Sequence, residues 1–111
     1  MLIACGYLAT AEVFDPRAGG FRPGPTMAHR RHKIAGTTVL LQGGDVLVTS
    51  GAPVAERLDV ARWAFREVPG RLPAAYRFAT ASPLDGGDVI IAGGHSDRNE
   101  NTPGVWRYRR P

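Results

Sequence analysis

The chain has 111 residues, a single cysteine, and a formal net charge of +4 from 14 basic and 10 acidic residues. The lone Cys5 excludes an internal disulfide and a Cys-x-x-Cys metal site. All basic residues except Lys33 are arginines, and they are scattered along the chain. Nucleic-acid binders usually cluster basic residues on one element with aromatics between them, so we expect no nucleic-acid partner.

The 14 glycines and 9 prolines indicate many turns, while an apolar content of 43% is too high for a disordered chain. No apolar run approaches the roughly 18 to 20 residues of a membrane span. No basic leader with a long apolar run precedes Cys5. We therefore expect a soluble chain without a signal peptide or transmembrane segment, in a compartment that the sequence does not specify.

Apolar runs bounded by Gly, Pro and Asp predict short strands, and none of them has the period of a helix. Glycine pairs at 43–44 and 86–87 predict tight hairpins, because glycine adopts the positive φ that such turns need. The ten strands are expected at residues 2–5, 11–15, 21–22, 32–41, 45–49, 56–60, 64–68, 77–84, 89–92 and 105–109.

Part of this pattern repeats along the chain. The segment 43–51 (GGDVLVTSG) returns 43 residues later as 86–94 (GGDVIIAGG), with five of nine positions identical. A weaker copy stands at 2–6 (LIACG), and Ala11–Asp15 (AEVFD) returns as 55–59 (AERLD) at an offset of 44. A period in this range is typical of propellers and solenoids, so we expect an array of similar sheets.

The repeat divides the chain into a partial unit at 1–24, a complete four-stranded unit at 32–68 and a second partial unit at 77–111. Aromatic residues are expected in the core or between neighbouring units, because they bury large apolar areas. These aromatics are Phe21, Phe65, Trp63 and Trp106. The expected buried strand residues are Leu40, Val46, Val48, Val89 and Ile91.

The order of these elements resembles the kelch-repeat family. The double glycine is Gly93-Gly94, with Ser50-Gly51 and Cys5-Gly6 as degraded copies. The outer strand with its turn and aromatic corresponds to 11–16 (AEVFDP) and Gly20-Phe21, and the entry to the inner strand to Arg31-His32 before Ala35. Nearly the whole chain takes part in the resemblance.

The resemblance implies an all-β fold of kelch-type β-propeller blades, about two and a half of them, with one complete blade between two partial ones. Most members are non-catalytic binding modules, and this is the function we expect, with no cofactor. The chain would then be part of a larger propeller, and its partners the remaining blades or further copies of itself. The alternative is part of a secreted propeller enzyme, such as a galactose-oxidase-like copper oxidase or a carbohydrate-active protein, whose active residues lie elsewhere.

Because strand direction alternates, the loops that enter the inner strands and those that follow the double glycines emerge on one face. Arginine presents a planar donor fork that suits carboxylates, so we expect this face to bind an acidic peptide or glycan. The candidate ligand-binding residues are His29, Arg30, Arg31, Arg71, Tyr76, His95, Asp97, Arg98 and Asn99.

The sequence offers little for chemistry at these loops. His29 and His32 have no acidic or Cys ligand beside them, so the pair does not predict a metal site. The polar segment 96–102 (SDRNENT) lacks the glycine and bidentate Glu of a helix-loop-helix calcium site, and a solvated loop is the default reading. No phosphate-binding glycine loop or nucleophile elbow is present.

Overall fold

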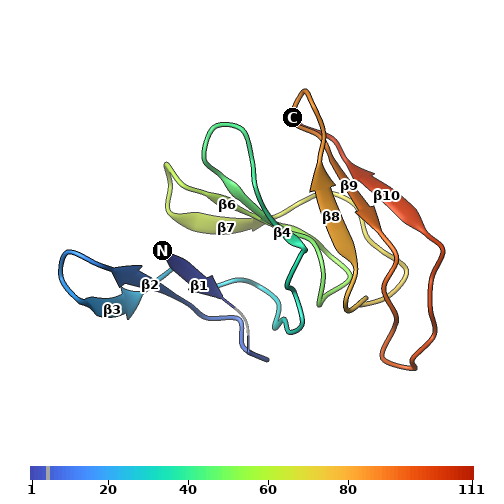
Figure 1. Cartoon of the computed structure of the whole chain (residues 1–111), viewed down its shortest axis with the longest axis horizontal. Helices are drawn as coiled ribbons and strands as arrows, with labels where there is room; N and C mark the ends of the chain where they lie inside the picture. The colour runs from blue at the N-terminus through green and yellow to red at the C-terminus, as the bar shows by residue number, and fades with distance from the viewer. Residues whose placement is uncertain (5) are drawn as a thin grey trace.

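The computed structural model describes residues 1–4 and 6–111. The described residues form ten strands and no helix, so none of them builds a helix long and apolar enough to cross a membrane. The strands pair into three antiparallel sheets that follow one another across the molecule (Figure 1). The first sheet holds β1 (Leu2–Ala4), β2 (Ala11–Asp15) and β3 (Gly20–Pro23); the middle sheet holds β4 (Thr38–Leu40), β5 (Val46–Val48), β6 (Glu56–Asp59) and β7 (Ala64–Glu67); the third sheet holds β8 (Thr80–Pro83), β9 (Val89–Ala92) and β10 (Val105–Tyr108).

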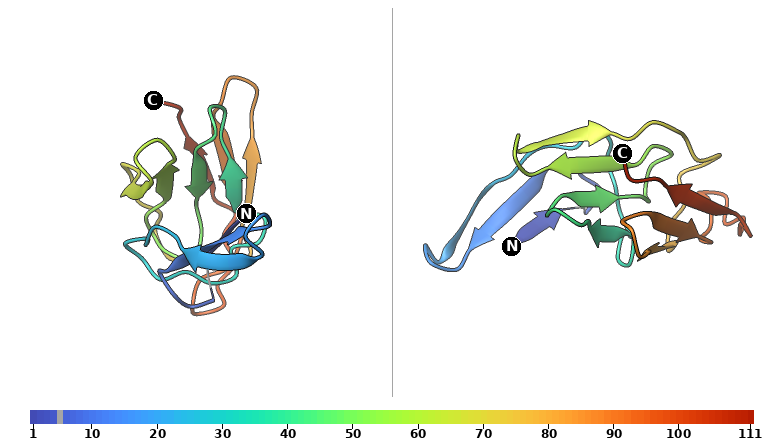
Figure 2. Two further views of the ribbon diagram at one scale, coloured as in Figure 1. Left: turned by 90° about the vertical axis from the view of Figure 1, so that its left-hand side faces the viewer. Right: turned by 90° about the horizontal axis from the view of Figure 1, so that it is seen from above.

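This architecture confirms the expected all-β class and the expected succession of three, four and three strands. Figure 2 shows the three sheets from two further sides, in an elongated array with extents of 44 × 32 × 20 Å. In each sheet the strands follow one another in chain order, so each strand pairs with its neighbour in the sequence. The connections range from tight turns to the long loop at 93–104 between β9 and β10. The expectation that the first strand extends to Cys5 lies outside the described residues.

The repeated Gly-Gly-Asp segment forms the same turn and the same Asp–Arg hydrogen bond in the middle and third sheets. The two glycines of each copy have φ between 92° and 98°, which an L side chain adopts only at a cost. The following aspartate accepts a hydrogen bond from an arginine of the third strand of its sheet, Asp45 from Arg57 and Asp88 from Arg107, each at 2.7 Å. The sequence repeat is therefore also a repeat of contacts.

The core lies between the sheets, and the middle sheet contributes both of its faces to it. Val48 of β5 packs with Met27 and Ile34 against the first sheet. The preceding Leu47 points to the opposite face, as alternation in a strand requires, and belongs to a cluster shared with the third sheet. That cluster consists of Val39, Leu47, Val89, Ile91 and Tyr108.

The inner strands are shorter than expected, and one expected core residue is exposed. Residues 32–41 form a strand only at Thr38–Leu40, because Thr37 donates its backbone N–H to Ile34 in a turn at 3.0 Å. Leu40 was expected to be buried but is 71% exposed. It lies opposite Val46 on the face directed to the first sheet, and that sheet begins at β1, with no further described strand to cover Leu40.

The remaining expectations for the core are met in most places. Val48, Val89 and Ile91 are buried, and Val46 is half-buried. Phe65 packs on the cluster between the first and middle sheets, and Trp106 packs on the cluster between the middle and third sheets, as expected. Two aromatics depart from the expectation, because Phe21 is 62% exposed and Trp63, which has a positive φ of 55°, is 39% exposed.

The exposure of Phe21 follows from its place on the first sheet. Ile3 pairs with Glu12 in the first sheet as Val48 pairs with Glu56 in the middle sheet, so Ile3 and Val48 are equivalent positions. Val48 is buried because the first sheet covers it, whereas Ile3 and Phe21 are exposed on the outward face. The outward face of the first sheet thus repeats a face that the middle sheet buries.

The third sheet shows the same relation on its other side. Ile90 pairs with Arg107 as Leu47 pairs with Arg57, yet Leu47 is fully buried and Ile90 only half-buried. Val105 is also exposed at this sheet. Both ends of the array therefore present apolar positions whose counterparts are covered inside it, and such faces promote association.

We expect the chain to self-associate as its concentration rises, through these two outward faces. Replacing Phe21 or Val105 with Lys should shift the population toward the monomer, because a charge on an apolar contact face opposes association. Sedimentation velocity over a concentration series measures this. Val60→Lys is the matched control, since Val60 is exposed at the turn after β6 and not on an outward face. A wild-type chain that stays monomeric at every concentration would contradict the prediction.

Candidate anion-binding groove

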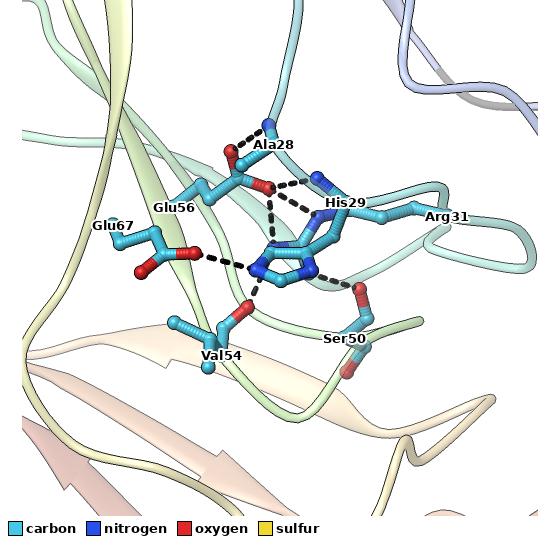
Figure 3. A network of polar contacts seen from close by, with 7 residues as sticks. All are labelled: Ala28, His29, Arg31, Ser50, Val54, Glu56 and Glu67. Atoms are coloured by element: carbon cyan, nitrogen blue, oxygen red, sulfur yellow. Dashed lines mark hydrogen bonds and ion pairs between the residues drawn. The ribbon is translucent and has the colours of Figure 1, made fainter.

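Arg31, one of the predicted ligand-binding residues, lies at the centre of a buried polar network (Figure 3). Its side chain is 0% exposed. Two of its nitrogens donate to Glu56 Oε2, Nε at 3.2 Å and Nη2 at 2.8 Å. The guanidinium also donates to the carbonyls of Ser50, at 2.7 Å, and Val54, at 2.5 Å. This network ties the entry to the middle sheet to the loop between β5 and β6.

Glu56 completes the network from the other side. Its Oε1 accepts a hydrogen bond from the backbone N–H of Ala28 at 2.6 Å, and its Oε2 accepts one from His29 N at 3.3 Å. Burial lowers the pKa of Arg31, while the hydrogen bond and charge of Glu56 act in the opposite direction. The placement of Arg31 on an exposed loop face is therefore wrong, because the side chain is fully used inside the protein.

Tyr76 is the second predicted site residue that lies in the interior. Its ring stacks on Trp106 with a centroid distance of 5.2 Å, and the residue is buried. Trp106 pairs with Ile91 in the third sheet as Glu56 pairs with Val48 in the middle sheet. The Tyr76–Trp106 stack therefore takes in the third sheet the place that the Arg31–Glu56 pair takes in the middle sheet.

The other predicted loop residues divide into two groups. In the first, His29 Nε2 donates a hydrogen bond to Glu67 Oε1 at 2.6 Å, while Arg30 and Arg71 are exposed. In the second, between β9 and β10, Asp97 pairs with Arg77, and the half-buried His95 exchanges backbone hydrogen bonds with Arg77. Three of the predicted residues in that loop are exposed, namely Asp97, Arg98 and Asn99.

The two histidines considered as metal ligands do not face a common point. His29 contacts Glu67, and the ring of His32 stacks on Tyr7 at a centroid distance of 4.2 Å. Desolvation, together with the nearby charges of Arg77 and Lys33, lowers the pKa of His32. Among residues 1–4 and 6–111, no three His, Cys, Asp or Glu side chains are grouped so that they could hold a metal ion.

Arginines gather instead at a groove between the outer strands of the middle sheet and β10. The groove has a volume of about 690 Å³. Its residues were not among the predicted site residues, because the register of the β6–β7 hairpin and the approach of β10 bring them together. The charged lining residues are Arg57, Asp59, Arg62, Arg66, Glu67, Arg107 and Arg109.

The middle sheet places two of these arginines side by side. Arg57 on β6 pairs directly with Arg66 on β7. Like charges opposite each other on neighbouring strands are destabilising unless a counter-charge lies between them. Asp45 supplies one for Arg57, at 2.7 Å, and its hydrogen bond is the main reason that the pKa of Arg57 is raised.

Two further carboxylates neutralise arginines around the groove. Asp59 pairs with Arg62 and Asp88 with Arg107, both at 2.6 Å. Hydrogen bonds from Arg62 lower the pKa of Asp59, and hydrogen bonds from the backbone N–H of Arg110 and from Arg107 lower that of Asp88, so both carboxylates are ionised at neutral pH. Arg66 and Arg109 form no ion pair with any described residue. Even with the carboxylate of Glu67 in the lining, the arginines around the groove outnumber the carboxylates, and Arg66 and Arg109 are the ones without an ion-pair partner among the described residues.

Comparison with protein-family models and with curated proteins found no match for this chain.

Proposed function

We propose that the chain is a kelch-type array of β-propeller blades that acts as a non-catalytic binding module for acidic ligands. One complete blade, the middle sheet, would stand between two partial blades. The repeat of the Gly-Gly-Asp hairpins with their Asp–Arg pairs supports this assignment, as do the outward faces that repeat a buried one. A rigid sheet array with charged side chains at its periphery is suited to binding, and fold alone specifies no reaction.

The observation that carries the proposed ligand class is the pair of arginines at the groove that lack a carboxylate partner. Arg66 lies opposite another arginine, and Arg109 follows β10 at the other wall. An arginine donates to carboxylate, sulfate or phosphate oxygens through two parallel hydrogen bonds. An acidic peptide or acidic glycan would supply the direct ion-pair partner that neither arginine has among the described residues.

We expect the double substitution Arg66→Gln/Arg109→Gln to weaken binding of hexaglutamate and of a sulfated oligosaccharide by about tenfold or more, since each hydrogen bond to a charged group contributes roughly 1.5 to 3 kcal/mol. Fluorescence anisotropy at several salt concentrations measures the effect, and wild-type binding should weaken as salt rises. Glutamine keeps a polar side chain of similar reach, so the fold should be retained.

The matched variant is Arg71→Gln/Arg98→Gln, which removes the same charge from the exposed loops. If the acidic probes bind in the groove, this loop variant should bind them with nearly the wild-type affinity. If the loop variant loses the ligand and the groove variant keeps it, the site is on the loop face and the groove assignment is wrong. If neither acidic probe binds the wild-type chain, the proposed function fails.

A further inference from the structure

The third sheet lacks the outer strand that the middle sheet has. In the middle sheet β7 pairs with β6, whereas β10 is the last strand of the third sheet, and its outer edge pairs with no described residue. The strand pairing shows which residues of β10 and β6 are equivalent. Trp106 lies opposite Ile91 of β9, as Glu56 lies opposite Val48 of β5. Val105 is therefore the counterpart of Ala55. In the middle sheet the equivalent edge of β6 is covered by β7, whereas this edge of β10 is covered by no described strand.

The backbone of β10 has its hydrogen-bonding groups directed to this edge. In the middle sheet Val68 donates its N–H to the carbonyl of Ala55 at 2.9 Å, across the gap to β7. In the third sheet Gly93 donates to the carbonyl of Gly104 at 3.2 Å, while the Gly104 amide donates to Thr102 Oγ1 at 3.0 Å. Continuing this register along β10 places the amides at 106 and 108 toward β9. Because hydrogen bonding alternates along an antiparallel pair, the amides at 105, 107 and 109 face outward. Val105, at the start of this edge, is 64% exposed.

Charge indicates what kind of strand fits there. A strand added at this edge would run along the groove, with alternate side chains directed toward the middle sheet, where Arg66 lies, and toward the side of Arg107 and Arg109. Opposite charges across neighbouring strands are stabilising. A row of carboxylates on either face of the strand therefore meets arginines.

We propose that an extended acidic peptide segment binds by adding to the free edge of β10 as a fourth strand, which completes the third sheet on the pattern of the middle one. This inference rests on the proposed function and narrows its ligand from any acidic molecule to a peptide in extended conformation. Main-chain hydrogen bonds supply affinity in this mode, and alternate side chains supply specificity. A glycan with the same charge cannot make the ladder of backbone bonds.

The test uses a hexapeptide of alternating Glu and Val, capped at both ends. Its matched probes are the same peptide with every amide N-methylated, which keeps the carboxylates and removes the donors, and hexaglutamate. We expect N-methylation to weaken binding by about tenfold or more, because several backbone hydrogen bonds are lost together. Amide hydrogen exchange should slow at 105, 107 and 109 when the unmodified peptide binds.

The outcomes separate this inference from the proposed function. Equal affinities for the methylated and unmethylated peptides, with no added protection along β10, would show binding by charge alone, and the added strand would be wrong while the anion site stands. The Val105→Pro variant gives an independent check, since proline removes an outward amide without touching the bonds to β9. Retained peptide affinity and unchanged protection in that variant would also count against the added strand. If no acidic probe binds at all, the proposed function is the part that fails.

Discussion

Replacing Arg31 with Ala is expected to lower the free energy of unfolding by about 3 to 5 kcal/mol, because it leaves Glu56 as an unpaired buried charge. Arg31 is 0% exposed, and its loss would also free the carbonyls of Ser50 and Val54 (Figure 3). A loss of this size is a large part of the total stability of a small domain. Urea unfolding followed by tryptophan fluorescence and circular dichroism measures it.

The control is Arg30→Ala, the exposed neighbour in the same loop, for which a change within roughly 0.5 kcal/mol is expected. The third sheet suggests a compensating pair, since the Tyr76–Trp106 stack occupies the place of Arg31–Glu56. The double substitution Arg31→Tyr/Glu56→Trp should therefore be more stable than Arg31→Ala, in line with buried ion pairs elsewhere that tolerate replacement by packed apolar residues. An Arg31→Ala variant as stable as the Arg30→Ala control would refute this account of the network.

The sequence predicted the hairpins and the sheet succession well, because both depend on local chemistry. The glycine pairs at 43–44 and 86–87 need positive φ, and the apolar runs beside them are too short for any alternative to a strand. The whole-strand boundaries of Ala11–Asp15 and Val89–Ala92 agree with the structure. Such features need only neighbours within a few residues.

Local sequence chemistry did not predict which charged residues are buried or which apolar strand residues are exposed. Arg31 is buried because it pairs with Glu56. This burial was not predicted, because the two residues are 25 positions apart in the sequence and a loop arginine without a known partner is expected to be solvated. A signal was present in the repeat, since Glu56 recurs as Glu12 in the first copy. Leu40 was misplaced for the opposite reason, because an apolar strand residue is buried only where a neighbouring sheet covers it.

The groove depended on pairing register. Arg57 and Arg66 become neighbours only through the β6–β7 hairpin, and Arg109 reaches the groove only because the third sheet packs on the middle one. The prediction that arginine would be the ligand-binding residue type carries over to the proposed groove, while the residues differ from those expected. Hairpin register, applied to every pair of arginines that flank a turn, is the sequence signal that would have located the first two.

Replacing Gly94 with Ala is expected to destabilise the third sheet by about 1 to 3 kcal/mol more than replacing Gly93, the range typical of overpacking. Both glycines have positive φ, 69° at Gly93 and 92° at Gly94, so both substitutions share the cost of that backbone conformation. Only at Gly94 does a Cβ meet its surroundings, since it would lie 2.7 Å from the carbonyl oxygen of Arg77, whereas at Gly93 no atom lies within 4 Å.

The clash at Gly94 would involve Arg77, which pairs with His95 just before β8, the inner strand of the third sheet. Arg77 and His95 exchange backbone hydrogen bonds at 2.9 and 3.1 Å, and relief of the contact requires Arg77 to move away from the chain at Gly94. We therefore expect the Gly94→Ala variant to lose stability in urea unfolding and to lose exchange protection at the amides of Arg77 and His95, while Gly93→Ala keeps that protection. Equal losses in the two variants would mean that positive φ alone determines the need for glycine, and that the close approach of Arg77 contributes nothing measurable.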